Sequence, residues 1–224
     1  MAMQITTYLR DIQSAVERVD TDGIEAIVAR LFQAFLDGST IYTMGNGASA
    51  ALASHMACDL GKGTATDLAR GPGVASAPRL RIMSLNDNVA LMTAYSNDLS
   101  YQDVFVEQLK NFLQLGDVVI GVSGSGGSPN VLRAMAFARG NGATTIGMTG
   151  SQASAYKLLE LSDLFVQATP RQMEQIEDLH VIVHHVIGLS LRERIAAHLL
   201  AGVVASGEAP FRAEAPTAVA QPGD

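Results

Sequence analysis

The chain has 224 residues, 48% of them hydrophobic, and a formal net charge of −7, which suits one α/β domain with a large core. The acidic balance argues against nucleic acid as the main partner, and no run of 18 uncharged apolar residues indicates a membrane span. The N-terminus lacks the pattern of a secretion signal and there is one cysteine, so we expect a cytoplasmic protein.

The first third of the chain reads as helices followed by a strand and another helix. The predicted elements are helices near residues 6–18 and 22–37, a strand over 40–44 and an alanine-rich helix over about 49–60. Asp20 and the two residues after it open the second helix, and Gly38 closes it. We expect Cys58, on the third helix, to be a small buried side chain.

Strands and helices then alternate to the end of the domain. The remaining predicted elements are a loop over 61–78, a strand over 79–85, helices over 87–95 and 101–113, a strand over 117–122, a helix to about 139, strands over 143–148 and 163–167, and a long helix over about 172–200. Residues 96–98 interrupt the helical run and Ser100 caps the next helix. This alternation predicts right-handed crossovers and a mostly parallel sheet.

The long helix carries apolar residues on nearly every face, which is typical of a helix buried on all sides. In a chain of this size, that pattern predicts packing between subunits and hence a homo-oligomer. We interpret residues 1–202 as a single domain with a leading helical pair. Residues 203–224, rich in alanine, proline and small residues, are expected to form a disordered tail.

The strand over residues 117–122 ends in a loop rich in glycine and serine. Ser128 is placed to cap the following helix, with Pro129 at its first position. Free backbone N–H groups, the positive helix end and the hydroxyls of Ser123, Ser125 and Ser128 would together bind an anion. No triphosphate-binding lysine motif and no dinucleotide fingerprint is present, so one phosphate monoester fits best. The alternative is a plain flexible turn.

A second loop of this kind, Gly45 to Ser49, follows the first strand. Ser49, at the start of its helix, could face the same ligand. One such loop is weak evidence, but two at corresponding places in one sheet favour a ligand site.

Histidines and carboxylates recur at helical spacing. His55 and Asp59 lie one turn apart and could bind a metal or act as an acid/base pair. His180, His184 and His185 gather on the long helix near Glu177; spacing pairs Glu177 with His184 and does not select His185. The alternative is that these are core histidines with satisfied hydrogen bonds. His198 is expected at the surface.

These residues resemble the sugar isomerase (SIS) domain family and, within it, the phosphoheptose isomerase branch. The resemblance covers about residues 5–195 and rests on Gly45–Ser49, His55, Asp59, Ser96–Asp98, Tyr101, Phe105, Gly116–Ala134 and Ile176–His185. It implies a three-layer, flavodoxin-like α/β/α fold with a five-stranded parallel sheet. It also implies a homotetramer whose active sites lie at subunit interfaces.

The resemblance also assigns roles to individual residues. Asp59 and His185 would be the catalytic acid/base pair. Substrate-binding positions would be Asn46, Gly47, Ala48, Ser49, Asn97, Asp98, Ser123, Gly124, Ser125, Ser128 and Glu177. Family members that bind zinc imply one ion per subunit, held here by His55, Asp59, Glu177 and His185.

Three positions depart from the family pattern. Asp59 stands where a glutamate is usual and is one methylene shorter. Glu177 stands where a glutamine is usual, and its carboxylate would tighten a divalent cation but repel an enediolate if no metal is bound. Gly124 replaces a common threonine, which removes one hydroxyl from the loop.

The resemblance implies an aldose–ketose isomerase that converts sedoheptulose 7-phosphate to a D-glycero-heptose 7-phosphate, manno or an epimer, through an enediol. The alternative is a non-catalytic scaffold, like relatives that bind the bacterial replication initiator, or a protein that senses a sugar phosphate. Retained His55, Asp59 and His185 favour the enzyme.

Overall fold

The five predicted strands all form, and they pair in one parallel sheet in the order β2-β1-β3-β4-β5. The computed structural model describes residues 5–65 and 77–206. The strands are β1 (Thr40–Gly45), β2 (Arg81–Ser84), β3 (Val118–Ser123), β4 (Thr144–Thr149) and β5 (Leu164–Gln167). The helices are α1 (Ile5–Val16), α2 (Thr21–Asp37), α3 (Ala48–Gly63), α4 (Val89–Asp98), α5 (Val106–Phe112), α6 (Pro129–Gly140), α7 (Tyr156–Glu160) and α8 (Met173–Ser206).

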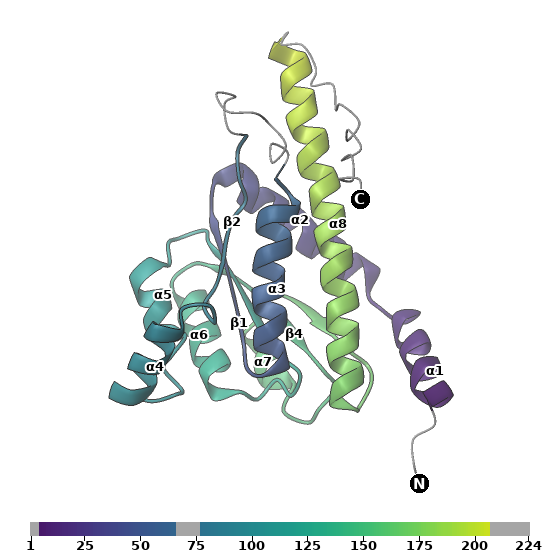
Figure 1. Cartoon of the computed structure of the whole chain (residues 1–224), viewed down its shortest axis with the longest axis vertical. Coiled ribbons are helices and arrows are strands. Elements are labelled where there is room, and N and C mark those ends of the chain that lie inside the picture. Colours follow the sequence, from purple (N-terminus) through teal and green to yellow (C-terminus); the bar gives the residue numbers. More distant parts are fainter. Residues whose placement is uncertain (1–4, 66–76, 207–224) are drawn as a thin grey trace, which may run out of the picture.

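Helices cover both faces of the sheet, which gives the predicted three layers (Figure 1). β3 lies at the centre and all six of its residues are buried, as its apolar run predicts. On one face, alternate strand residues such as Ile120 pack against α2, α3 and α8. On the other face, residues such as Val119 pack against α5, α6 and α7. The carboxyl ends of the strands therefore meet at one edge, where the two glycine-rich loops lie.

The predicted punctuation of the second helix is confirmed. The side chain of Asp20 caps α2 by accepting a hydrogen bond from the backbone N–H of Gly23 at 3.0 Å. Gly38 ends the helix with φ near +67°, a backbone conformation that glycine adopts without steric cost.

Between β2 and β3 the helices differ from those predicted. α4 runs through Ser96 to Asp98 instead of being interrupted there, and the next helix begins only at Val106. Ser100 accepts a hydrogen bond from the backbone N–H of Gln102, so it stabilises a turn before that helix rather than capping it. Local polar residues favoured a break, but helical hydrogen bonding continues through them.

α8 is the longest helix, and it runs beside α3 and beyond its end (Figure 1). It extends to Ser206, past the boundary expected at residue 202, while residues 207–224 lie outside the described part of the chain. One face is buried, but Val186, Leu189 and Leu200 are 43%, 51% and 56% exposed in the single chain. The helix is therefore not buried on all sides by its own chain. None of the helices in the described ranges is both long and apolar enough to cross a membrane.

The expectation for Cys58 is wrong, since its side chain is exposed. The core-facing positions of α3 are Leu52, Met56 and Leu60. Cys58 lies two residues from Met56, about 200° around the helix, so it points away from that face. His198 is exposed, as predicted.

Candidate active site

The loop after β3 gathers three serine hydroxyls at the edge of the sheet. The Ser123 Oγ lies 3.0 Å from the Ser128 Oγ and 3.4 Å from the Ser125 Oγ. The backbone N–H of Gly126 donates to the Ser123 Oγ at 3.1 Å. Ser128 occupies the N-cap position of α6, but its side chain makes no capping hydrogen bond. The hydroxyls therefore face one another next to the helix N-terminus, an arrangement that suits an anion.

Two glycines of this loop fit tight places. Gly126 has φ near +66°, and a Cβ there would lie 2.5 Å from the Ala155 Cα, so a larger residue would displace backbone. A Cβ on Gly124 would meet the Met173 Sδ at the start of α8. Gly124, which replaces the threonine common in the family, thus allows α8 to begin directly against the serine loop.

Paired asparagines join the two loops. The Asn46 amide donates to the Asn130 Oδ1 at 2.9 Å, and the Asn130 amide donates back to the Asn46 Oδ1 at 2.8 Å. The Tyr101 hydroxyl also donates to the Asn46 Oδ1, at 2.8 Å. Asn130 was not singled out as a site residue from the sequence. The sequence feature that could have identified Asn130 is its position as the second residue of α6, opposite the loop that contains Asn46.

The remaining residues predicted to contact the sugar lie in two different places. Ser49 is buried, while Gly47 and Ala48 are exposed. A hollow of about 180 Å³ lies between α3 and α8, lined by Ala48, Ser49, Ala51, Leu52, His55, Glu177, His180 and Val181. Asn97 and Asp98 are exposed at the end of α4, where the Asn97 amide donates to the Asp98 carboxylate at 2.8 Å. They are not among the residues that line this hollow.

α3 and α8 bring three histidines around one carboxylate. The Asp59 Oδ2 lies 3.2 Å from the His55 Nε2, 3.3 Å from the His184 Nε2 and 3.7 Å from the His185 Nε2. One ligand atom from each of the four residues lies within 4.8 Å of the others, so the group could hold a metal ion. Asp59 and His185 are thus neighbours, as the resemblance implied. Glu177 is not part of the group.

His184 is the member of this group to which the resemblance gave no role, although spacing along the helix had paired it with Glu177. It is fully buried, whereas the side chains of His55, Asp59 and His185 are 39% to 48% exposed. Burial, and then repulsion from the neighbouring His185 and His55, lowers its pKa to about 4. Its imidazole is therefore neutral near pH 7, the form in which histidine binds a metal.

His180 is buried one turn before His184. Its Nε2 lies 3.1 Å from the carbonyl oxygen of Thr149, which ties α8 to the end of β4. Burial lowers the pKa of His180 from 6.5 to about 4, against a smaller raising effect of that hydrogen bond.

We expect the burial of His180, which lowers its pKa, to make stability depend on pH. Well above pH 6.5 the ring is neutral in both states. As the pH falls from 6.5 towards 4, the unfolded chain binds the proton first, so the native state loses stability. Urea unfolding in the presence of chelator should show a larger loss between pH 7.5 and pH 5 for the wild type than for His180→Gln. Gln keeps a donor for Thr149 but does not titrate. Equal losses would contradict this assignment, and His198→Gln should match the wild type.

The histidine cluster lies well along α3 from the first glycine-rich loop. Asp59 is ten residues after Ser49, which corresponds to a rise of about 15 Å at about 1.5 Å per residue. Because α3 runs back along the sheet, the cluster lies away from the strand ends where the loops gather. A second hollow, of about 250 Å³, is lined by Asp59, Gly63, His185, Gly188, Leu189 and Arg192.

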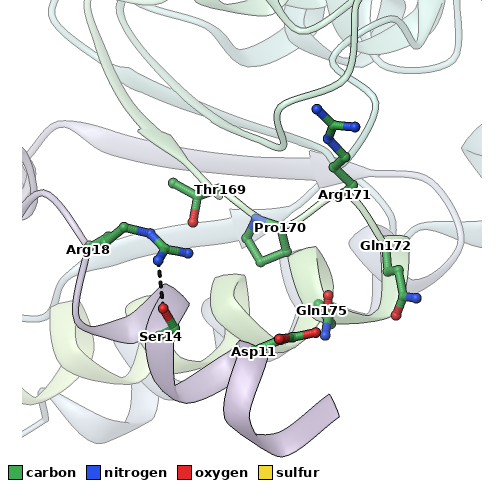
Figure 2. Close-up of a pocket in the computed structure, with 8 residues that line it drawn as sticks. All are labelled: Asp11, Ser14, Arg18, Thr169, Pro170, Arg171, Gln172 and Gln175. Atoms are coloured by element: carbon green, nitrogen blue, oxygen red, sulfur yellow. Dashed lines mark hydrogen bonds between the residues drawn. The ribbon is translucent and has the colours of Figure 1, made fainter. Parts of the chain in front are cut away.

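A third hollow, of about 480 Å³, lies between α1 and the segment that leads into α8 (Figure 2). In Figure 2, the Arg18 guanidinium turns towards Ser14, to which it donates a hydrogen bond at 2.6 Å, and Arg171 points away from the hollow. This hollow shares no lining residue with the histidine cluster or the serine loop. It is therefore not where the predicted chemistry gathers.

Comparison with known proteins decides the family. The model of the SIS domain matches residues 6–150. The chain belongs to the SIS-domain family. It is 31% identical over 190 residues to a phosphoheptose isomerase of Pelobacter propionicus, covering 84% of this chain and 95% of that protein. It is 37% identical over 177 residues to one of Crocosphaera subtropica, covering 78% of this chain and 80% of that protein.

A solved SIS-family structure has the same fold. The phosphoheptose isomerase of Neisseria gonorrhoeae superposes with a TM-score of 0.72 at 23% identity, over 84% of this chain and 94% of that one. The sequence relatives match over most of the chain. They place this protein in the phosphoheptose isomerase branch and identify it as an isomerase. The recognition made from the sequence motifs is confirmed.

Proposed function

We propose that this protein interconverts sedoheptulose 7-phosphate and a D-glycero-heptose 7-phosphate through an enediol. The observation that carries the proposal is the approach of Asp59 to His185, 3.7 Å apart, on a fold of the phosphoheptose isomerase branch. The three-serine loop supports a phosphate ester as the substrate's anchor. The α3–α8 hollow, with Ser49 and Glu177 in its wall, offers polar groups for hydroxyls.

Phosphate binding in this proposal falls to the loop after β3. Ser123, Ser125 and Ser128 donate hydroxyl hydrogen bonds to the phosphate oxygens, and the N-terminus of α6 adds its positive dipole. Asn46, Gly47 and Ala48 of the first loop contact the sugar. Gly124 contributes only backbone to the phosphate. Asn97 and Asp98 act on the sugar only if a neighbouring subunit presents them, since they lie outside the hollow of their own chain.

The chemical step moves one proton between neighbouring carbons. After ring opening, one of Asp59 and His185 removes a proton from C1 of the ketose. The C1–H electron pair forms the C1–C2 double bond, the C2 carbonyl π pair moves to O2, and O2 takes up a proton to give the enediol. The partner group then delivers a proton to C2, and the O1 proton is lost as the C1 carbonyl forms. Carboxylates and imidazoles are common general acids and bases in enzymes.

We also propose that His55, Asp59 and His185 hold one zinc ion. Imidazole and carboxylate are ordinary zinc ligands, and one ligand atom from each of these three residues lies within 4.8 Å of the others. When bound, zinc supplies Lewis-acid stabilisation of the enediolate oxygen.

The complete site, in this proposal, is built from more than one chain of a tetramer. Ser49 lies at the same edge of the sheet as the serine loop, since β1 and β3 are neighbours, and the rise of about 15 Å from Ser49 to Asp59 exceeds the length of an extended seven-carbon chain. A phosphate held by one chain would therefore place the carbonyl end near Asp59 and His185 of another. Exposed apolar residues on α8, such as Leu189, supply a surface for such packing. We place the assembly in the cytoplasm.

The test is product identification. Purified protein incubated with sedoheptulose 7-phosphate in D2O should give an aldoheptose 7-phosphate with one solvent deuterium at C2, detected by NMR, because the C2 proton comes from a group in exchange with solvent. Unphosphorylated sedoheptulose, the matched control, should turn over far more slowly. Binding without turnover would instead indicate a sensor, and a stable protein partner without turnover would indicate a scaffold.

A further inference from the structure

His184 is a buried imidazole without a well-formed hydrogen bond. Its side chain is 0% exposed, its Nε2 lies 3.3 Å from the Asp59 Oδ2 outside ordinary hydrogen-bond geometry, and its Nδ1 has no partner. His180, buried on the same helix, has Thr149 as a partner for one of its ring nitrogens. A buried polar group without a partner costs about 1–3 kcal/mol, so such a group in a native fold requires an explanation. A bound ion supplies one.

The three distances from Asp59 to the histidines match the edges of a tetrahedral metal site. Zinc ligands lie about 2.0–2.1 Å from the ion, so the edges of a tetrahedron of ligand atoms measure about 3.3 Å. The distances from the Asp59 Oδ2 to the Nε2 atoms of His55, His184 and His185 are 3.2, 3.3 and 3.7 Å. The His184 Nε2 is close to the carboxylate without being aligned for a hydrogen bond to it.

Glu177 occupies a different place. It lies two helical turns before His184 on α8 and lines the α3–α8 hollow together with Ser49 and His55. It is absent from the group of four side chains whose ligand atoms lie within 4.8 Å of one another. Burial, followed by repulsion from Glu174 and Asp178, raises its pKa. Of the two candidates for a fourth ligand, His184 is the one beside the other three.

We propose that His184 is a metal ligand in this chain, so that His55, Asp59, His184 and His185 hold the ion and Glu177 is left to the substrate hollow. This rests on the metal site of the proposed function. A set of three imidazoles and one carboxylate favours Zn²⁺ and Co²⁺ over Mg²⁺, which prefers oxygen ligands. It also gives the site a net charge of +1 with a divalent ion, whereas adding Glu177 would make the site neutral.

The test uses full-length protein stripped of metal and reloaded with Co²⁺ or Zn²⁺. Zinc affinity is measured by competition with a chromophoric chelator. In the Co²⁺ form, exchangeable imidazole N–H signals are counted in the paramagnetic proton NMR spectrum, and the visible absorption reports tetrahedral coordination. The variants are His184→Leu, which fills the buried volume without a nitrogen, and Glu177→Gln, which keeps the shape of the side chain but removes its charge.

We expect three shifted N–H signals in the wild type and in Glu177→Gln, and two in His184→Leu. Zinc affinity should fall at least about a hundredfold in His184→Leu, since loss of supporting groups alone costs about 10–100-fold. In Glu177→Gln it should change less than about twofold. His184→Gln serves as the second variant if His184→Leu does not fold, as judged by circular dichroism and gel filtration.

Wild-type affinity and three N–H signals in both His184 variants would overturn the proposal, as would a wild-type protein that binds neither ion at micromolar concentration. A large loss of affinity in Glu177→Gln alone would overturn it in favour of Glu177. Heptose turnover is measured separately. Absence of turnover with a His184-dependent metal site refutes the proposed reaction and supports this ligand set.

Discussion

Replacing Asp59 with asparagine, or His185 with glutamine, should lower kcat/KM for sedoheptulose 7-phosphate by about 10²–10⁴-fold, the usual contribution of a general acid or base. Both substitutions keep the size of the side chain and remove its ability to exchange a proton with the sugar. Because one group removes the proton and the other returns it, either loss should stop the same turnover. Deuterium exchange into the substrate, followed by NMR, should fall along with product formation.

The metal cluster complicates this experiment, because Asp59 and His185 are also proposed ligands. Bound zinc should therefore be measured in each variant, and assays should be repeated with zinc in excess. A deficit that persists at full zinc occupancy is the one that proton transfer predicts. His198→Gln, an exposed histidine on the same helix, should retain wild-type rates. If Asp59→Asn and His185→Gln both turn over like the wild type, the acid/base assignment is wrong.

Sequence reasoning was most successful where local chemistry determines structure. The apolar run from Val118 and the loop after it predicted the central strand, the serine cluster and the start of α6, because burial on both faces leaves a clear pattern. Asp20 and Gly38 marked helix ends for the same reason: they act through neighbouring backbone groups. The prediction that Cys58 is buried was wrong because an alanine-rich helix gives little contrast in hydrophobicity between its faces.

The members of the cluster around Asp59 could be identified only from the tertiary structure. Spacing along α8 paired His184 with Glu177, since it considers one helix only. The partner that matters lies on α3, and which α8 side chain meets it depends on how the two helices cross. The resemblance supplied His185 but not His184, because a resemblance transfers only the positions that the family shares.

The exposed apolar residues of α8 also show what one chain leaves open. The pattern over residues 172–200 predicted burial on all sides, yet the single chain covers only one face. Val186 and Leu189 remain half exposed on the same stretch of helix as His185. A second copy packed there would cover these residues and bring its own loops close to the cluster.

Mixing two inactive variants should restore activity if the site is shared between chains. One variant, Ser125→Ala with Ser128→Ala, loses two hydroxyls that bind phosphate; each charge-assisted hydrogen bond is worth about 1.5–3 kcal/mol, so kcat/KM should fall by more than about a hundredfold. The other is Asp59→Asn. In a hybrid oligomer, an intact serine loop from one chain can meet an intact Asp59 from another.

Random assembly of equal amounts should give about one quarter of wild-type activity, since half of the loops and half of the carboxylates are intact and each site takes one of each from different chains. The variants are co-expressed with different tags, and hybrids carrying both tags are purified and assayed. Hybrids no more active than the sum of the two parents would contradict the shared site, because a site built within one chain always retains its own lesion. Co-expression of Asp59→Asn with His185→Gln is the matched control: both changes lie in the same cluster, so each cluster in the hybrid remains damaged and activity should stay absent.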